Sequence, residues 1–589
     1  MQAYWILAPI LIPIVTGVLL LLRPIADDRK RNIVIELVVI VNTILTLYLI
    51  ANRPDGTFYL FTLGTNLSIA LGIDGLSMLF GGMVALLWPF ASLYAFEYMR
   101  HEERKNSFMA FYTITYGVTL GIAFSANIVT MYLFYEMLTL VTLPLVMHYM
   151  DKEARYATRK YLYYMIGGTA FAFIAIVFYT LMCSDLAFAL GGNLDPALLG
   201  EYSGIVLLIY VFGFFGFGVK AAVFPFHGWL PSASVAPTPV TALLHAVAVV
   251  KAGVFAIIRL TWYCFGPEVL SGTWAQILVT VFVMFTVAYG STMGVRETHF
   301  KRRLAYSTVA NLSYILLGVV TMTPVGLAAG LAHMLVHAVT KISAFFCAGA
   351  VMHQTGKNYI YELDGLGRRM PVTFTAFLIA GLSLTGVPLF AGFISKWQLI
   401  QSLLDTGSVL GIAGVLVLLY SALMTGIYML TVAVRAFFPE HPLKADAPRG
   451  EFAEANSPMG SRCCAPVARV QHRPKRSVDA ASAATSEAAA PASAGAPAFF
   501  PEVAHLTAVQ AAAAAPASAK DAAGNAKNFP ESSATGELTK EEMPDKEEYT
   551  DPNWLMTAPL IVFSVVIILI GCHAQPLLDF VGNIAQGVL

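Results

Sequence analysis

The sequence predicts an all-α polytopic membrane protein with about fourteen transmembrane helices. Of its 589 residues, 57% are hydrophobic and only 12% are charged, whereas a soluble domain carries about 25% charged residues. Apolar stretches recur along the chain and are not confined to an N-terminal signal segment. The stretches approach the about 20 residues that a helix needs to cross the hydrocarbon core. Helices are required because lipid offers no partner for unpaired backbone groups.

Hydropathy sets the positions of the predicted spans. The first seven are Tyr4–Leu22, Ile33–Ile50, Gly75–Phe96, Phe108–Phe124, Ile128–Tyr149, Tyr161–Met182 and Ile205–Phe224. The other seven are Val240–Leu260, Trp274–Met293, Leu304–Val320, Leu327–Met352, Val372–Leu399, Leu410–Val434 and Leu555–Ile570.

The connections between spans predict the orientation in the membrane. Connections one, three, five, nine and eleven each hold three or four Lys or Arg residues, and the even-numbered ones are nearly bare except for Arg53. Only the seventh connection, 226–239, lacks the expected charge. Since Lys and Arg mark the cytoplasmic side, we expect a multi-pass protein of the cell (inner) membrane with both termini outside.

The composition changes abruptly between the last two spans. Residues 439–553 are rich in Ala, Pro, Ser, Glu and Lys, with too few large apolar side chains to offset the entropy of ordering. This predicts a disordered cytoplasmic insert. Cys463 and Cys464 lie in it, as a passive pair or as a thiol switch.

Charge and cysteine content exclude several functions. The 36 basic and 36 acidic residues balance, so no basic excess exists to bind nucleic acid. The six cysteines form no CxxC pair or Cys/His cluster, which argues against an iron–sulfur site, a zinc site or a disulfide scaffold. No cofactor and no metal site is expected in this chain.

Among the charged residues inside predicted spans, five are the informative ones: Glu136, Lys220, Lys251, Lys341 and Lys396. Each costs about 2.5–3.5 kcal/mol at the centre of a helix in lipid. A single lysine could snorkel or form a structural ion pair. Four lysines cannot all pair with the one central carboxylate, so a hydrated internal path with titrating groups explains the set better.

The eleventh span carries a polar row. His333, His337 and Lys341 recur at i, i+4 and i+8, which places them on one helix face. Neutral imidazole can accept a proton on one nitrogen and donate from the other, so this row favours proton transfer. An interhelical hydrogen bond is the simpler alternative, and zinc ligation lacks a third ligand. His245, in the eighth span, is a further candidate for the path.

Two spans contain proline and glycine at membrane depth. The stretches are 220–239 and 385–396, and each contains one of the intramembrane lysines. Two interpretations stay open. The stretches are simple proline kinks, or they are the paired helix breaks typical of transporters built from inverted repeats. A weak sequence similarity between 244–251 and 336–341, which both contain His-Ala-Val and end in Lys, favours the inverted repeats.

Together these motifs resemble the antiporter-like family, which comprises large proton-pumping subunits of respiratory complex I, Mrp-type Na⁺/H⁺ antiporter subunits and subunits of energy-converting membrane-bound hydrogenases. The resemblance covers about residues 60–438. The residues that carry it are Tyr135-Glu136, the stretch from Lys220 to His245, His333-x3-His337-x3-Lys341, Gly392-Phe-Ile-Ser-Lys396 and the loop Asp364–Pro371. The long insert departs from the family pattern.

The resemblance implies a domain organisation. Residues 1–106 would form helices 1–3, 107–262 and 263–438 two inverted five-helix repeats with helices 7 and 12 broken, and 554–589 the last helix and tail.

The resemblance also implies a role for each intramembrane residue. Glu136 would be the ion-pairing carboxylate, Lys220 its partner, and Lys251 or His245 the next relay group. His333, His337 and Lys341 would form the central bridge, and Lys396 would be the terminal lysine. Redox centres would reside in partner chains, so the partners implied are other membrane subunits of a respiratory, hydrogenase or Mrp complex.

The expected function is movement of protons, or their exchange for Na⁺, along this row in a redox-driven respiratory-type complex. Two other classes stay open: a structural subunit that anchors a redox arm, and an ion-coupled transporter of an organic solute. A structural spacer would be more stable in lipid with leucine at these positions. No sequence feature singles out a solute pocket.

Overall fold

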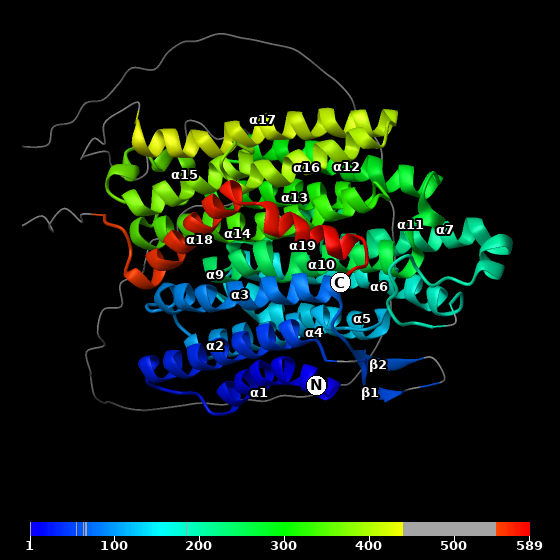
Figure 1. Ribbon diagram of the computed structural model, residues 1–589. Helices are drawn as coiled ribbons and strands as arrows, with labels where there is room; N and C mark the ends of the chain where they lie inside the picture. Colours follow the sequence, from blue (N-terminus) through cyan, green and yellow to red (C-terminus); the bar gives the residue numbers. More distant parts are fainter. Residues whose placement is uncertain (1, 55, 63, 65–66, 184, 440–548) are drawn as a thin grey trace, which may run out of the picture. The chain divides into compact units, whose positions relative to one another are not determined.

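The computed structural model describes residues 2–54, 56–62, 64, 67–183, 185–439 and 549–589, without the side chains of 196–201 (Figure 1). Apart from its ends, the predicted insert at 439–553, with Cys463 and Cys464, lies outside the described residues.

Helices dominate the described chain (Figure 1). The first ten are α1 (Ala8–Leu22), α2 (Asp28–Asn52), α3 (Gly75–Tyr98), α4 (Lys105–Ala123), α5 (Ile128–Val146), α6 (Lys152–Thr180), α7 (Pro196–Gly218), α8 (Trp229–Ser232), α9 (Thr238–Ala242) and α10 (Val249–Ile258). They are followed by α11 (Pro267–Leu270), α12 (Trp274–Arg296), α13 (Phe300–Val319), α14 (Pro324–Thr355), α15 (Pro371–Thr385), α16 (Ala391–Asp405), α17 (Val409–Phe437), α18 (Trp554–Cys572) and α19 (Gln575–Ala585).

The helices have the length and composition of a membrane protein. Within the described ranges, 10 helical segments are long and apolar enough to cross a membrane, and Tyr202–Gly218 and Pro371–Thr385 are shorter apolar helices. The chain is therefore a multi-pass membrane protein.

The expectation of an all-α chain is wrong at one place. Strands β1 (Phe58–Thr62) and β2 (Ser68–Leu71) form an antiparallel pair in which Phe58 faces Leu71. Aromatic residues in β1 favour a strand, and the segment is far too short to cross the membrane. Asn127, which caps α5, donates from Nδ2 to the Ser68 carbonyl at 2.9 Å, so the hairpin is tied to the start of α5.

Both interruptions lie near the prolines that predict them. After α7 the chain loses helical form at Val219 and regains it in the 3₁₀ turn η2 (Phe226–Gly228) and in α8. Between α15 and α16, Gly386 has φ +93°, a left-handed conformation that favours glycine. Each interruption leaves backbone carbonyls without helical partners.

The segment on either side of α10 contains two π-helical stretches that the sequence did not predict, η4 (Leu243–Val247) and η5 (Arg259–Phe265). A π-turn adds one residue to a helical turn, and such turns are frequent at functional sites. Hydropathy does not register the extra residue, because the side chains stay apolar.

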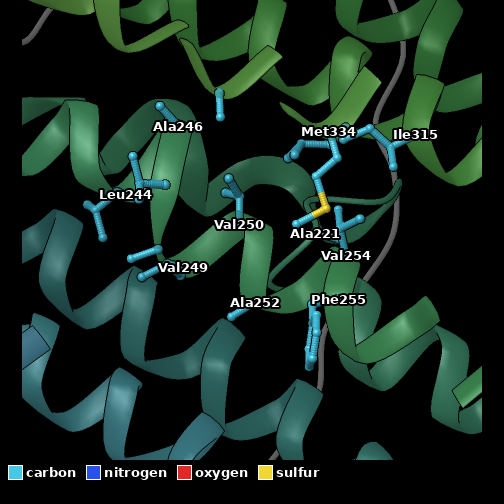
Figure 2. Packing of buried hydrophobic residues seen from close by; sticks show 14 of the residues in the cluster. Ala221, Leu244, Ala246, Val249, Val250, Ala252, Val254, Phe255, Ile315 and Met334 are labelled. Carbon is cyan, nitrogen blue, oxygen red and sulfur yellow. The ribbon is translucent and has the colours of Figure 1, made fainter. Parts of the chain in front are cut away.

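α14 lies at the centre of the packing. It contacts α13, α15, α16 and α18, and also α9 and η4. Figure 2 shows the close-packed apolar side chains here, among them Ala221, Val250, Val254, Ile315 and Met334, all buried. Any charged group on these helices is therefore surrounded by an apolar core, where an unpaired charge is costly.

Candidate functional site

The predicted site residues are enclosed by protein. The four lysines Lys220, Lys251, Lys341 and Lys396 and the three histidines His245, His333 and His337 are buried, with Lys396 the most exposed at 8%. Glu136 is half-buried. Long basic side chains normally extend toward water, so enclosure of all four lysines calls for specific polar partners.

Lys251 and His337 are directly bonded. Lys251 Nζ on α10 lies 2.9 Å from His337 Nδ1 on α14. The other ring nitrogen, His337 Nε2, is buried with no hydrogen-bond partner among the described residues. The imidazole therefore has one occupied nitrogen and one available nitrogen, the arrangement that proton transfer through a ring requires.

His333 continues the row one turn earlier on α14. Its ring centroid lies 6.1 Å from that of His337. Nε2 lies 3.3 Å from Asn311 Oδ1, and Nδ1 lies 2.9 Å from Ser395 Oγ. Asn311 Nδ2 donates to the Ser307 carbonyl, which leaves Oδ1 to accept from Nε2. The neutral ring therefore carries its proton on Nε2 and accepts from Ser395 at Nδ1.

Lys396 occupies the second interruption. Its Nζ donates to the carbonyls of Leu384 and Thr385 at 2.5 and 3.2 Å, which the end of α15 leaves free. The same Nζ lies 5.0 Å from the centroid of the Tyr314 ring, and that ring lies 5.3 Å from His333. Lys396 and His333 thus share Tyr314 as a neighbour.

Glu136 and Lys220 do not form the direct ion pair expected of them. Lys220 Nζ donates to the backbone carbonyl of Tyr135 and lies 3.3 Å from the centroid of that ring. No ion pair within 4.0 Å joins it to Glu136 in the described chain, and Glu136 Oε1 is buried without a hydrogen-bond partner. The interruption after Gly218 leaves Lys220 free to reach the carbonyl of Tyr135. The two charges still interact electrostatically.

Lys341 follows His337 by one turn of α14, and it shares Phe345 as a neighbour with His245. Lys341 Nζ donates to the Leu304 carbonyl at 3.1 Å and lies 5.9 Å from the Phe345 ring. That ring is 4.7 Å from the His245 ring, and neither His245 nitrogen has a partner among the described residues. No bond in the described chain joins this pair to His337.

The structure therefore brings six of the predicted residues together in two groups, and Lys341 and His245 form a separate pair. In the first group, which we call the buried row, Lys251 bonds His337, the His337 ring contacts the His333 ring, and His333 and Lys396 share Tyr314 as a neighbour. Glu136 and Lys220 form the second group, beside α5. The backbones of the two groups touch at Gly253, where an added Cβ would lie 2.4 Å from the Ala221 nitrogen. Glycine at this position allows α10 to pack against the interruption that carries Lys220.

Sequence reasoning missed several polar neighbours. Asn311 and Tyr314 on α13 and Ser395 on α16 contact the row; polar residues in an otherwise apolar span were the available signal. It also placed Lys301 in a connection, but α13 begins at Phe300 and Lys301 is 5% exposed. Lys301 Nζ donates to the Ala236 carbonyl at 2.9 Å, which links α13 to the first interruption.

The described residues contain no group of three or more His, Cys, Asp or Glu side chains that could hold a metal ion. The chemistry that this site offers is therefore that of its buried amines, imidazoles, hydroxyls and one carboxylate, all of which exchange protons.

Comparison with known proteins places the chain among membrane subunits. Residues 125–425 match the family model "NADH:quinone oxidoreductase/Mrp antiporter, TM", and residues 60–109 match "NADH-Ubiquinone oxidoreductase (complex I), chain 5 N-terminus". The chain is 33% identical over 406 residues to NADH-quinone oxidoreductase subunit N of Desulforudis audaxviator, covering 67% of this chain and 77% of that protein.

A second relative is longer. The chain is 34% identical over 359 residues to a Na⁺/H⁺ antiporter subunit of Alkalihalophilus pseudofirmus, which covers 58% of this chain and only 44% of that protein. The fold matches a chain of the Mrp complex from a Dietzia species with TM-score 0.72 and 20% identity, over 99% of this chain and 96% of that one. The matched stretch contains every residue of the row, and the chain belongs to the family of NADH:quinone oxidoreductase and Mrp antiporter membrane subunits.

Proposed function

We propose that the chain is a proton-translocating membrane subunit of a respiratory-type or antiporter complex, and that protons move along the buried row. The observation that carries this proposal is the set of contacts from Lys251 through His337 and His333 to Lys396. A chain that only anchored other subunits would gain stability from apolar residues at these positions.

The central step uses the two nitrogens of His337. The ammonium of Lys251 gives a proton to Nδ1, and the imidazolium that forms releases the proton from Nε2 toward His333. The neutral His333 ring accepts this proton at Nδ1 while the Ser395 hydroxyl turns to the Gly392 carbonyl. Nδ1–H then gives the proton to Ser395 Oγ as that hydroxyl releases its own proton. Ser395 directly precedes Lys396, whose amine takes the proton at the second interruption.

Glu136 and Lys220 control loading of the row in this proposal. A carboxylate close to a buried amine stabilises its protonated form. The Glu136 carboxylate interacts with Thr169, but its Oε1 has no hydrogen-bond partner among the described residues, so a small side-chain movement would change its distance from Lys220. The amine then releases its proton toward α10. Lys341 and His245 form a side branch that exchanges protons with the row through intervening water.

The finer architecture is part of the same proposal. Fourteen spans, with 107–262 and 263–438 as inverted repeats, are supported by the two interruptions, each of which carries a lysine. The alternation of Lys and Arg supports termini outside and a cytoplasmic insert. Partners would be other membrane subunits. Exchange of H⁺ for Na⁺ is the variant that the name of the antiporter relative supports.

The test is ion transport by the assembled complex, with this chain in place, reconstituted in vesicles. Lys220→Ala and Lys396→Ala should each reduce coupled proton movement by about tenfold or more, since a positioned proton-transfer group contributes about 10²–10⁴-fold. Lys30→Ala is the matched control, because the Lys30 side chain is 79% exposed, and it should have no effect. Undiminished transport in both buried-lysine variants would refute the relay.

A further inference from the structure

A second carboxylate lies inside an apolar helix, remote in sequence from the row. Glu36 is eight residues beyond Asp28, the first residue of α2, which is about 12 Å along the helix at 1.5 Å per residue. It is half-buried, and its Oε2 accepts a 2.5 Å hydrogen bond from Ser92 Oγ on α3. Glu36 is the fourth residue of the predicted span Ile33–Ile50, near its end and not at its centre, so it was not among the residues predicted for the path.

The helices around Glu36 bury polar atoms that have no protein partner. Tyr112 on α4 is 1% exposed and interacts electrostatically with Glu36. Its hydroxyl has no hydrogen-bond partner among the described residues, and neither does Nε1 of Trp88, which is also 1% exposed. The rings of Trp88 and Tyr112 lie 5.5 Å apart. Buried polar atoms without a hydrogen-bond partner destabilise an apolar core unless a ligand or water bonds to them.

The polar side chains continue along α2 away from Asp28. Thr43 Oγ1 lies 3.0 Å from the hydroxyl of Tyr116, whose ring stacks on Trp88 at 4.8 Å. Asn42 and Thr46, both fully buried, also interact with the Tyr116 hydroxyl. Polar groups therefore line the interior of α2–α4 on both sides of Glu36.

The other end of this polar column carries paired charges. Asp28 forms ion pairs with Arg31 at 2.8 Å and with Lys105 of α4 at 2.6 Å. Arg31 is 3% exposed and its Nε has no partner among the described residues. By the Lys/Arg pattern this end is cytoplasmic. Polar groups thus extend from the charged end of α2, at Asp28, to the Glu36 carboxyl about two helical turns further along.

We propose that Glu36 is a proton-binding site, loaded from the end that carries Asp28 and Lys105 and separate from the Lys251–Lys396 row. A neutral carboxylic acid suits a half-buried position, and it can donate to a hydroxyl as well as accept from one. The hydroxyls of Ser92 and Tyr112 can donate to the ionised carboxylate or accept from the neutral acid. The contacts that the structure gives for Glu36, Ser92 and Tyr112 stay within α2–α4.

The neighbouring groups favour a proton over a metal cation. The N–H of Trp88 is only a donor and cannot ligate a cation, and hard cations need about six oxygen ligands. The other charged residues on the helices around Glu36 are Asp28, Arg29, Lys30 and Arg31 on α2, Glu97 on α3 and Lys105 on α4, and α1 carries none. The other carboxylates in this set are already in ion pairs, Asp28 with Arg31 and Lys105 and Glu97 with Arg100, so neither is free to join Glu36 in binding a metal ion.

The experiment uses the full chain in its complex, in vesicles. An apolar carbodiimide, which reacts with protonated carboxyls in apolar surroundings, is added over a pH series, and the adduct on the Glu36 peptide is measured by mass spectrometry. We expect an adduct that declines as pH rises and is unaffected by Na⁺ at constant pH. Glu36→Gln should abolish it, and should also remove a carboxylic-acid band from the infrared spectrum.

A pair of serine variants separates the site from a general effect on the fold. Ser92→Ala removes the hydroxyl that stabilises the carboxylate and should move the loss of labelling to higher pH. Ser564→Ala, a buried serine on α18, should leave the profile unchanged. Protection of Glu36 by Na⁺ would overturn the proposal in favour of a cation site. Absence of both the adduct and the infrared band would show that Glu36 stays ionised.

Discussion

Lys251 Nζ and His337 Nδ1 lie 2.9 Å apart across the interface between α10 and α14. The π-helical stretch η4 ends at Val247, just before α10. One extra residue in a helix rotates the residues after it by about 100°. The direction in which Lys251 points therefore depends on η4. The same extra residue explains why Lys251, and not His245, is the partner of His337.

Replacement of His337 tests this connection. His337→Ala removes both the acceptor of Lys251 and the free Nε2, so proton transport by the complex in vesicles should fall by about 10²-fold. His573→Ala, an exposed histidine beyond α18, is the matched control. The complex should still assemble, as checked by its elution volume. Transport equal to that of the control would mean that protons bypass α14.

Gly253 provides a test of the contact between the two groups. An added Cβ would lie 2.4 Å from the Ala221 nitrogen and 2.8 Å from the Lys220 carbonyl carbon, and backbone cannot move aside as a side chain can. Gly253→Ala should therefore lower stability by about 1–3 kcal/mol and reduce transport. Thermal unfolding in detergent measures the first effect. Gly167→Ala, with no atom within 4 Å of the new Cβ, should unfold at or above the wild-type temperature.

The sequence was enough to predict most of the helical organisation. Apolar stretches of about 20 residues determine the spans, and prolines such as Pro225 and Pro388 predict the interruptions, because proline lacks the N–H of a helical hydrogen bond. The spacing of His333 and His337 predicts their common face, and both do contact the groups around the row.

Other parts of the site depend on tertiary contacts that periodicity does not encode. The partner of Lys220 is the carbonyl of Tyr135, 85 residues away, and any residue offers such a carbonyl. Arg259 reaches Asp74, 185 residues away, from within η5. Asp74 also caps α3 by accepting from the Ser77 N–H, a local role that the sequence can encode, whereas the ion pair with Arg259 needs the fold.

Replacement of Asp551 tests how the segment after the insert is attached to α15. Its carboxylate accepts from the backbone N–H groups of Val372 and Thr373, each at 2.9 Å, so a distant residue caps the N-terminus of α15. Loss of such a cap costs about 0.5–2 kcal/mol. Asp551→Ala should lower the thermal unfolding midpoint, and it should weaken transport because the far end of α15 supplies the carbonyls of Lys396. Asp579→Ala, on exposed α19 surface, should do neither.

The ion pair of Asp74 with the buried Arg259 should control stability in acid. Arg259 is 1% exposed, and its guanidinium donates to both carboxylate oxygens of Asp74. Burial opposes ionisation of Asp74, but Arg259 and the Ser77 N–H outweigh it and hold the pKa of this carboxyl below its ordinary value. The pair therefore contributes its full stability above the ordinary carboxyl range of about pH 3.9 and loses it as pH falls through the lowered pKa of the folded state.

Two variants separate the charges of this pair. Asp74→Asn leaves a fully buried guanidinium without its counter-ion and should cost about 3–5 kcal/mol, whereas Arg259→Met leaves Asp74, 38% exposed, able to regain water and should cost less. The double variant should recover part of the loss, since the two sites are coupled. Thermal unfolding from neutral pH into the acid range measures all three. An acid profile of Asp74→Asn as steep as that of the wild type would assign the acid sensitivity to other carboxylates.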